Sequence, residues 1–244
     1  MSALKTAGII IIGNEILSGK VRDVNSYFLA CELRMLGVDV RRISVIPDEP
    51  ELIGKEAVEF SRAYDYVFTS GGVGPTHDDV TMSGIAKGFG VRLVVHTEIE
   101  KFLSVRYQDV MNPSVLKMAE VPEGAGIIFN DSMRFPVVLF HNIYIFPGIP
   151  EYLTAKFTVI RERFRTATFF LKRVFLNAHE SEFAAILNLV VENNPDVQFG
   201  SYPVKGDQGF RVIVTAESKS ETSLITALDD LLSKLPTAML VRIE

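Results

Sequence analysis

Apolar and polar residues alternate in blocks along the first two thirds of the chain. Residues 7–12 are apolar throughout, which is typical of a central strand buried on both faces of a parallel sheet. In residues 25–35 the apolar side chains recur at helical spacing, and Gly37 follows as a stop signal. The alternation continues, and the pattern predicts further strands at 38–46, 66–70, 126–129, 137–141 and 143–146, a loop at 113–126, and further helices at 48–63, 80–89, 98–111 and 151–164.

Strands that alternate with helices are joined by right-handed crossovers. The expected fold is therefore α/β, a doubly wound and mostly parallel sheet whose ligands bind beyond the carboxyl ends of the strands. The pattern changes near Thr166, and the chain after it suits a small α+β domain. We expect two domains, 1–166 and 167–244, the second with strands at 171–177, 197–202 and 210–216 and helices at 181–191 and 220–235.

Composition narrows the class of protein. The chain has 244 residues, of which 48% are hydrophobic, so it can fill a substantial core. The net charge of −5 argues against a nucleic-acid binder, which would carry a basic face. The apolar run at 7–12 is too short to cross a membrane and lacks a cleavage signature, so we expect a cytoplasmic protein with no membrane partner. The single cysteine, Cys31, lies among leucines and is expected to be a buried structural thiol.

The segment after the strand at 66–70 carries the clearest chemistry. Backbone N–H groups of glycines bind phosphate oxygens, and paired carboxylates suit a hard divalent cation. The alternative is a glycine-rich turn with a solvated acidic pair, but adjacent carboxylates repel one another without a cation. The segment has no Lys-Ser/Thr ending, so it is not a Walker A loop. We expect a phosphate site with a metal, formed by Gly71, Gly72, Gly74, Thr76, Asp78 and Asp79, in which Asp78 and Asp79 hold the metal.

Polar side chains also follow the first two strands. Asn14, Glu15 and Ser18 either cap a connection or line the ligand's phosphates or metal. Asn25 is either a helix N-cap or a ligand contact, and the residue type of Asp48 favours a helix cap. Because the carboxyl ends of parallel strands meet at one edge of a sheet, we expect these residues and the glycine loop to form one site.

A second candidate anion site follows the strand at 143–146. Pro147 and Gly148 form a turn that opens the next helix, and helix N-termini attract anions. Nearby, Arg134 either brings a guanidinium to a phosphate or is a plain surface residue. His77 lies in an exposed loop, and the other histidines have no metal-ligand spacing.

Together, these motifs resemble a known family. Segments 13–19, 23–26, 71–81 and 147–150 are similar to the molybdopterin-binding-like domain of competence/damage-inducible protein A, which also forms the N-terminal half of eukaryotic FAD synthase. The FAD-synthase version is the closer likeness, because segments 45–49, 134–136 and 142–150 match it. The resemblance covers residues 7–164, and segment 200–203 extends it into the small domain.

The resemblance implies a fold of the molybdopterin adenylyltransferase type and a pterin or nucleotide ligand. Asp48 and Asp79 match the two aspartates that serve the metal and catalysis in those transferases, which favours a catalytic role for Asp48 over that of a cap. Val73 stands where the transferases usually carry threonine. Asp78 and the pair at 14–15 follow pyrophosphatase-like relatives instead, which are associated with divalent-metal hydrolysis of ADP-ribose or FAD.

The leading hypothesis is a nucleotide pyrophosphatase that depends on Mg²⁺, Mn²⁺ or Co²⁺, with Asp79, Asp78 and Asp48 as catalytic residues. Adenylyl transfer to molybdopterin and non-catalytic binding of a pterin or nucleotide stay open, as does the choice among ADP-ribose, FAD and molybdopterin. No segment resembles the amidase domain of the competence protein or the adenylyltransferase half of FAD synthase, so neither activity is expected. Relatives oligomerise, so a homo-oligomer is expected.

Overall fold

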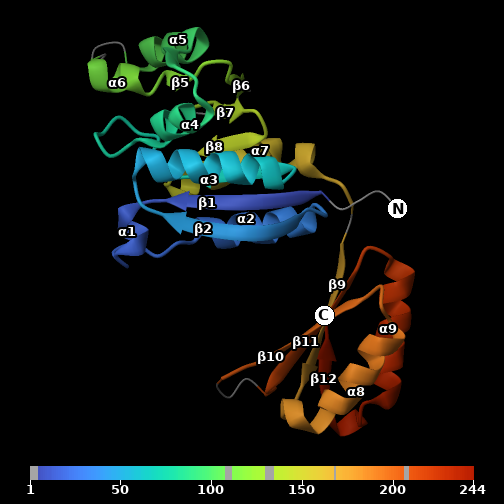
Figure 1. Cartoon of the computed structure of the whole chain (residues 1–244). Helices are drawn as coiled ribbons and strands as arrows, with labels where there is room; N and C mark the ends of the chain where they lie inside the picture. Colours follow the sequence, from blue (N-terminus) through green and yellow to red (C-terminus); the bar gives the residue numbers. More distant parts are fainter. Residues whose placement is uncertain (1–4, 108–111, 130–134, 168, 206–208) are drawn as a thin grey trace. The chain divides into compact units, whose positions relative to one another are not determined.

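The computed structural model describes residues 5–107, 112–129, 135–167, 169–205 and 209–244. Arg134 therefore lies outside the described residues. The chain divides into two compact units, residues 1–166 and 167–244, which we treat separately (Figure 1). In the described part of the chain, no helix is both long and apolar enough to cross a membrane.

The first unit is built on a six-stranded sheet that is mostly parallel. Its strand order is β2-β1-β3-β8-β7-β6, and the first four strands in this order run parallel to one another. β7 is antiparallel to β8, and β6 is antiparallel to β7. The expected α/β fold is confirmed, with these strand bounds: β1 Thr6–Ile12, β2 Asp39–Ile46, β3 Tyr66–Ser70, β6 Gly126–Ile128, β7 Val137–Phe140 and β8 Ile143–Phe146.

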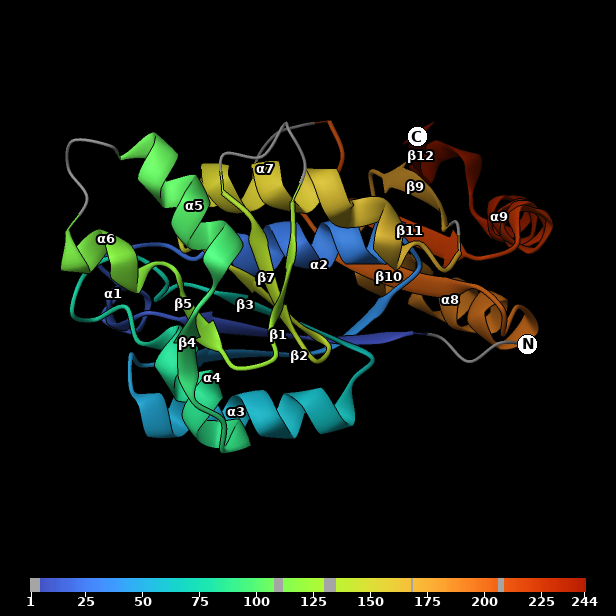
Figure 2. The ribbon, with the colours of Figure 1, turned by 90° about the horizontal axis from the view of Figure 1, so that it is seen from above.

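Helices cover both faces of this sheet. α2 (Asn25–Met35) and α7 (Pro150–Ile160) lie on one face, while α3 (Pro50–Ala63) and α4 (Thr81–Phe89) lie on the other (Figure 2). Each face has its own buried core, one centred on Phe68, Phe157 and Phe164 and the other on Ile10, Phe60 and Ile85. The isoleucines of β1 contribute to both cores, which is why residues 7–12 are apolar without alternation.

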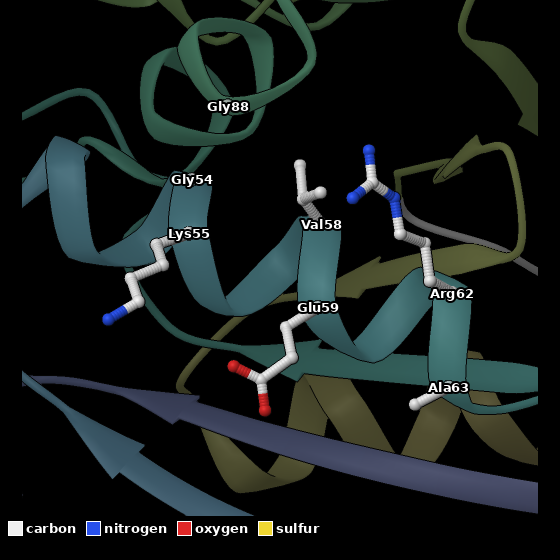
Figure 3. Close-up of a pocket in the computed structure, with 7 residues that line it drawn as sticks. All are labelled: Gly54, Lys55, Val58, Glu59, Arg62, Ala63 and Gly88. Carbon is white, nitrogen blue, oxygen red and sulfur yellow. The ribbon is translucent and has the colours of Figure 1, made fainter.

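α3 and α4 cross at unusually close range, and glycine permits it. A Cβ added to Gly54 would lie 2.6 Å from the carbonyl oxygen of Gly84 and 2.9 Å from the Cα of Gly88. Beside this crossing is an open hollow of about 500 Å³ along the second half of α3 (Figure 3). None of the residues that line the hollow follows the carboxyl end of a strand, so it is separate from the expected site.

Several elements differ from the sequence-based expectation. Residues 113–126, predicted as a loop, contain the short helix α6 (Pro113–Lys117), whose N-cap Asn112 accepts a hydrogen bond from the N–H of Val115 at 3.1 Å. β4 (Leu93–Val95) and β5 (Glu120–Pro122) pair as a two-stranded antiparallel sheet. They have only three residues each, too few for a periodic pattern. Among the described residues of this unit, the remaining helical segments are α1 (Asn14–Leu17), α5 (Thr97–Arg106) and the 3₁₀ turn η2 (Arg161–Phe164).

The prediction that Cys31 is buried is wrong. The thiol is exposed, whereas Leu29 and Leu33 of the same helix are fully buried. Residues two apart on a helix point in nearly opposite directions, so the leucines that face the sheet turn Cys31 away from it.

The second unit is a four-stranded antiparallel sheet with the order β10-β11-β9-β12. Its strands are β9 (Phe170–Leu176), β10 (Gln198–Pro203), β11 (Val212–Ser218) and β12 (Leu240–Ile243), and its helices are α8 (Glu180–Asn193) and α9 (Glu221–Lys234). The two helices pack on one face around Val174, Val214 and Leu231. β12, which follows the 3₁₀ turn η3 (Thr237–Met239), was not expected from the sequence.

Candidate site at the carboxyl ends of the parallel strands

The strand register brings four loops to one edge of the sheet. The last residue of β1, Ile12, pairs with the last residue of β2, Ile46. Ser70, at the end of β3, pairs with Ile11 on one side and with Phe146, at the end of β8, on the other. The loops that begin at residues 13, 47, 71 and 147 therefore leave the sheet side by side, as is typical of ligand sites in open α/β sheets.

Asn25 ties two of these loops together from below. Its Nδ2 donates to the Ser70 hydroxyl at 2.9 Å and to the Gly148 carbonyl at 2.7 Å. The Ser70 hydroxyl in turn donates to the Pro147 carbonyl at 3.1 Å. Asn25 is only 7% exposed, so its buried side chain connects the end of β3 to the Pro147–Gly148 turn by hydrogen bonds.

Asn25 is not the N-cap of α2, which was one of the two roles expected for it. The N-cap of α2 is Val24, and Asn25 is the first residue of the helix. The N–H groups of Asn25 and Ser26 are instead bound by the Asp23 carboxylate, at 2.9 and 3.1 Å. Asp23 thus takes the capping role, and an aspartate just before a helix is a signal that could have identified it.

The glycines of the loop are required by close contacts. Gly71 has a φ of 111°, and an added Cβ would run into the Ile12 carbonyl oxygen. Its N–H donates to the Phe146 carbonyl at 3.2 Å, so the expectation that this N–H binds phosphate is wrong. In the described residues no protein acceptor takes the N–H of Gly72 or Gly74, so these two donors are free for a ligand.

Asp79 folds back onto this loop. A Cβ on Gly74 would lie 2.6 Å from Oδ2 of Asp79, so the carboxylate occupies the space that a side chain at position 74 would need. The same Oδ2 accepts the Thr76 N–H at 2.8 Å. Thr81, the first residue of α4, is fully buried, and its hydroxyl donates to the Gly71 carbonyl at 2.8 Å. The loop is thus held in a fixed curve around the Asp79 carboxylate.

Thr76 brings Asp78 and Asp79 together. Its Oγ1 lies 2.5 Å from Oδ1 of Asp78 and 2.5 Å from Oδ2 of Asp79. One hydroxyl proton serves only one carboxylate at a time, so the three oxygens form a negative cluster. The hydrogen bond from Thr76 is the largest cause of a lowered pKa of Asp78, to which the nearby charges of His77 and Lys117 also contribute. His77 itself is almost fully exposed, with Nδ1 4.0 Å from Oδ1 of Asp78.

Lys117 is a residue of this site that sequence reasoning missed. It belongs to α6, and its Nζ donates to the carbonyl of Thr76, 41 residues earlier in the chain. Residues 113–126 were expected to be a loop, and no sequence pattern links Lys117 to the glycine loop. Only the packing of α6 reveals the contact.

Asp48 and Asn14 join the two remaining loops. Oδ2 of Asp48 accepts the Asn14 N–H at 2.8 Å, and the Gly13 N–H donates to the Ile46 carbonyl at 3.1 Å. Asp48 is therefore not a helix cap; the N-cap of α3 is Glu49, and it makes no side-chain cap bond. Asn14 and Glu15 are exposed in α1, and the Ser18 hydroxyl donates to the Glu15 carbonyl at 3.3 Å. The backbone of this loop is thus fixed by Asp48, while the side chains of Asn14 and Glu15 face solvent.

The donor set suits a metal that is shared with a ligand. Among the described residues there is no group of three or more His, Cys, Asp or Glu side chains that could hold a metal ion. At the candidate site, Asp78 and Asp79 offer two neighbouring carboxylates. Mg²⁺ is commonly bound by one or two carboxylates together with substrate phosphates, so this pair fits an ion that arrives with a phosphorylated ligand.

Comparisons with known proteins agree with this architecture. A family model described as probable molybdopterin binding domain matches residues 8–166, and one described as FAD synthase, middle domain, matches residues 168–244. A protein of Archaeoglobus fulgidus is 38% identical over 198 residues, covering 81% of this chain and 86% of that protein. A probable FAD synthase of Caenorhabditis elegans is 33% identical over 264 residues, covering 96% of this chain. The chain spans only about half of that relative, 51% of its length.

A solved structure gives a consistent result. The CinA protein of Thermoplasma acidophilum, described as being of unknown function, is 31% identical and aligns with a TM-score of 0.61. The alignment covers 66% of this chain and all of that one. The resemblance inferred from the motifs is confirmed. The chain belongs to the family of probable molybdopterin binding domains, in the form found in FAD synthases and CinA-like proteins.

Proposed function

We propose that this protein is a divalent-metal-dependent nucleotide pyrophosphatase. Its substrate is ADP-ribose, FAD or a similar adenosine diphosphate ester, which it hydrolyses to AMP and a phosphorylated product. The observation that carries the proposal is the loop in which Thr76 holds the carboxylates of Asp78 and Asp79 together, beside the free N–H groups of Gly72 and Gly74. Negative charge for a cation thus lies next to N–H donors for phosphate oxygens.

Each part of the loop has a role in this reaction. Asp79 and Asp78 would hold Mg²⁺, Mn²⁺ or Co²⁺, which supplies charge neutralisation at the diphosphate and activation of water. The N–H groups of Gly72 and Gly74 bind phosphate oxygens as their charge grows in the transition state. The water oxygen attacks the adenylyl phosphorus, and the bond from that phosphorus to the bridging oxygen breaks. Water is the proposed nucleophile because, in the part of the chain described, no serine or cysteine is hydrogen-bonded to a histidine.

Other predicted residues fix the loops that lie next to the glycine loop. Asn25 and the turn at Pro147 and Gly148 fix the end of β3 against β8. Asp48 fixes the loop of Asn14 through a hydrogen bond to its backbone. In this proposal Asp48 holds that loop through Oδ2 and keeps Oδ1 for the catalytic role expected from the family resemblance.

A hydrolysis screen tests the proposal. Purified protein is incubated with ADP-ribose or FAD and with Mg²⁺, Mn²⁺ or Co²⁺, and AMP is measured. We expect AMP release with at least one pair, and a decrease in rate on the order of 100-fold for Asp79→Asn. Asp229→Asn, the same change at an exposed position of α9, is expected to leave the rate unchanged. Absence of AMP above a protein-free blank with every metal would rule the proposal out.

Adenylyl transfer to molybdopterin is the second candidate. The match to a molybdopterin-binding family model favours it, as does the presence of Asp48 at the carboxyl end of β2 beside the loop of β1. It predicts an adenylylated pterin when molybdopterin and ATP are supplied, and no AMP from ADP-ribose. If a pterin or nucleotide binds without either product, and Asp79→Asn leaves the binding unchanged, the protein is a non-catalytic binding module.

A further inference from the structure

Lys117 approaches the glycine loop from a separate part of the chain. It lies in α6, is half-buried, and donates from Nζ to the carbonyl of Thr76. Thr76 is the residue whose hydroxyl lies between the carboxylates of Asp78 and Asp79. The ammonium is thus hydrogen-bonded to the residue that lies between the two candidate metal ligands.

The hydrogen bond of Lys117 goes to a neutral oxygen, while its charge also helps to lower the pKa of Asp78. In the described part of the molecule, its ammonium forms no ion pair with a carboxylate and has the Thr76 carbonyl as its hydrogen-bond partner. An ammonium carries three N–H donors, so a carbonyl leaves two of them unused. By contrast, Lys87 of α4 forms an ion pair with Glu51. A lysine that is held by a neutral oxygen keeps N–H donors for an anion.

The ligand class proposed above needs such a charge. The diphosphate of ADP-ribose or FAD places charged oxygens on two phosphorus atoms, and the described loop offers neutral N–H donors, among them those of Gly72 and Gly74, besides a metal at the carboxylates. Charge-assisted bonds from lysine to phosphate are stronger than neutral ones. An ammonium at Thr76 would neutralise the part of the diphosphate that the metal does not.

We propose that Lys117 is a substrate-binding residue that selects a diphosphate over a monophosphate. This inference rests on the proposed function for the identity of the ligand, but it concerns binding and not hydrolysis. The probes are therefore ADP and AMP, which share the adenosine and differ by one phosphate.

The test is a calorimetric titration of ADP and of AMP, each with Mg²⁺. Four proteins are compared: wild type, Lys117→Met, Lys117→Arg and the control Lys87→Met. We expect Lys117→Met to weaken ADP binding roughly ten-fold, the effect of one hydrogen bond to a charged group, while AMP binding changes by less than about two-fold. Lys117→Arg keeps the charge and is expected to restore most of the ADP affinity, and Lys87→Met to match wild type.

The outcomes separate this inference from the proposed function. If Lys117→Met weakens ADP and AMP equally, the lysine only holds the loop in place, and the inference is overturned. Equal binding of ADP by Lys117→Met and wild type overturns it as well, as does wild-type protein that binds no ADP. If ADP discrimination is lost as expected but no AMP is formed from any substrate, the inference stands and the pyrophosphatase proposal fails.

Discussion

Asn25 illustrates how one buried side chain can connect the segments of a candidate site. Its amide group is buried and bonds to groups that are 45 and 123 residues away in the sequence. Both protons of the amide nitrogen are used, so any substitution that removes them leaves the Gly148 carbonyl and the Ser70 hydroxyl short of a donor. Unpaired buried polar groups are costly, which makes this residue a sensitive position.

Asn25→Asp tests this at the residue scale. The aspartate has the same shape, but its carboxylate cannot donate and places negative charge against the Gly148 carbonyl oxygen. We expect the free energy of unfolding in urea to fall by about 2 kcal/mol, together with weaker ligand binding. Asn188→Asp is the matched control, since Asn188 is exposed on α8. An Asn25→Asp protein as stable as the wild type would show that the hydrogen bonds of Asn25 do not contribute to the free energy of unfolding.

At the scale of elements, a charged contact joins β1 and β3 at the amino end of the sheet. Asp65, just before β3, accepts hydrogen bonds from the N–H and the hydroxyl of Thr6 in β1, at 2.8 and 2.9 Å. Lys5 donates to the other oxygen of the same carboxylate at 2.6 Å. The bond from Lys5 and then the N–H of Thr6 lower the pKa of Asp65 from 3.8 to about 2.

This shift predicts a dependence of stability on pH. Because the pKa is lower in the folded protein, the contact contributes stability above the unfolded value of 3.8 and loses it as pH falls towards about 2. We expect Asp65→Asn to lower the free energy of unfolding at pH 7 by about 1 kcal/mol, allowing for solvent screening. Urea unfolding at several pH values should show the difference from wild type closing between pH 3.8 and about pH 2. A difference that does not vary with pH would contradict this origin.

The crossing of α3 and α4 is the second feature that depends on two elements at once. The glycines at 54, 84 and 88 belong to two helices, and each is explained only by the other helix. In isolation, glycine in a helix interior is unfavourable. Here it allows α4 to start directly at the end of the glycine loop while its backbone lies against α3.

At the scale of the whole molecule, the two units have separate cores. The clusters around Phe68 and Ile85 belong to residues 1–166, and those around Val214 and Leu224 to residues 167–244. We therefore expect residues 1–166, produced alone, to unfold in one cooperative transition and to bind ADP with the affinity of the whole chain. Circular dichroism and calorimetry measure both. A fragment without a cooperative transition would show that the first unit depends on the second.

Other expectations at this scale stay predictions. They are the homo-oligomer, the cytoplasmic location and the absence of a nucleic-acid partner. Apolar side chains that are more than a third exposed occur in both units, for example Tyr27 and Met35 on α2 and Ile225 on α9. Such residues are relevant to self-association.

The sequence was sufficient to predict the elements of the parallel sheet and the edge at which the candidate residues meet. Long apolar runs and helical spacing are local signals, and parallel strands bring their carboxyl ends together whatever their side chains do. For this reason Asn14, Asp48, the glycine loop and Pro147 could be assigned to one edge. The short strands β4 and β5 and the helix α6 were missed because three to five residues carry no period.

What only the tertiary structure decided is which atoms of the site are already bonded to protein. The N–H of Gly71 is used by Phe146, the carboxylate of Asp48 by Asn14, and the amide of Asn25 by Ser70 and Gly148. Lys117 reaches Thr76 only because α6 packs beside the loop. Residue type and spacing state what a group can bind, but its partner is chosen by distances across the fold. The sequence thus determined which residue types meet at this edge of the sheet, and the packing of distant segments determined which of their groups remain free for a ligand.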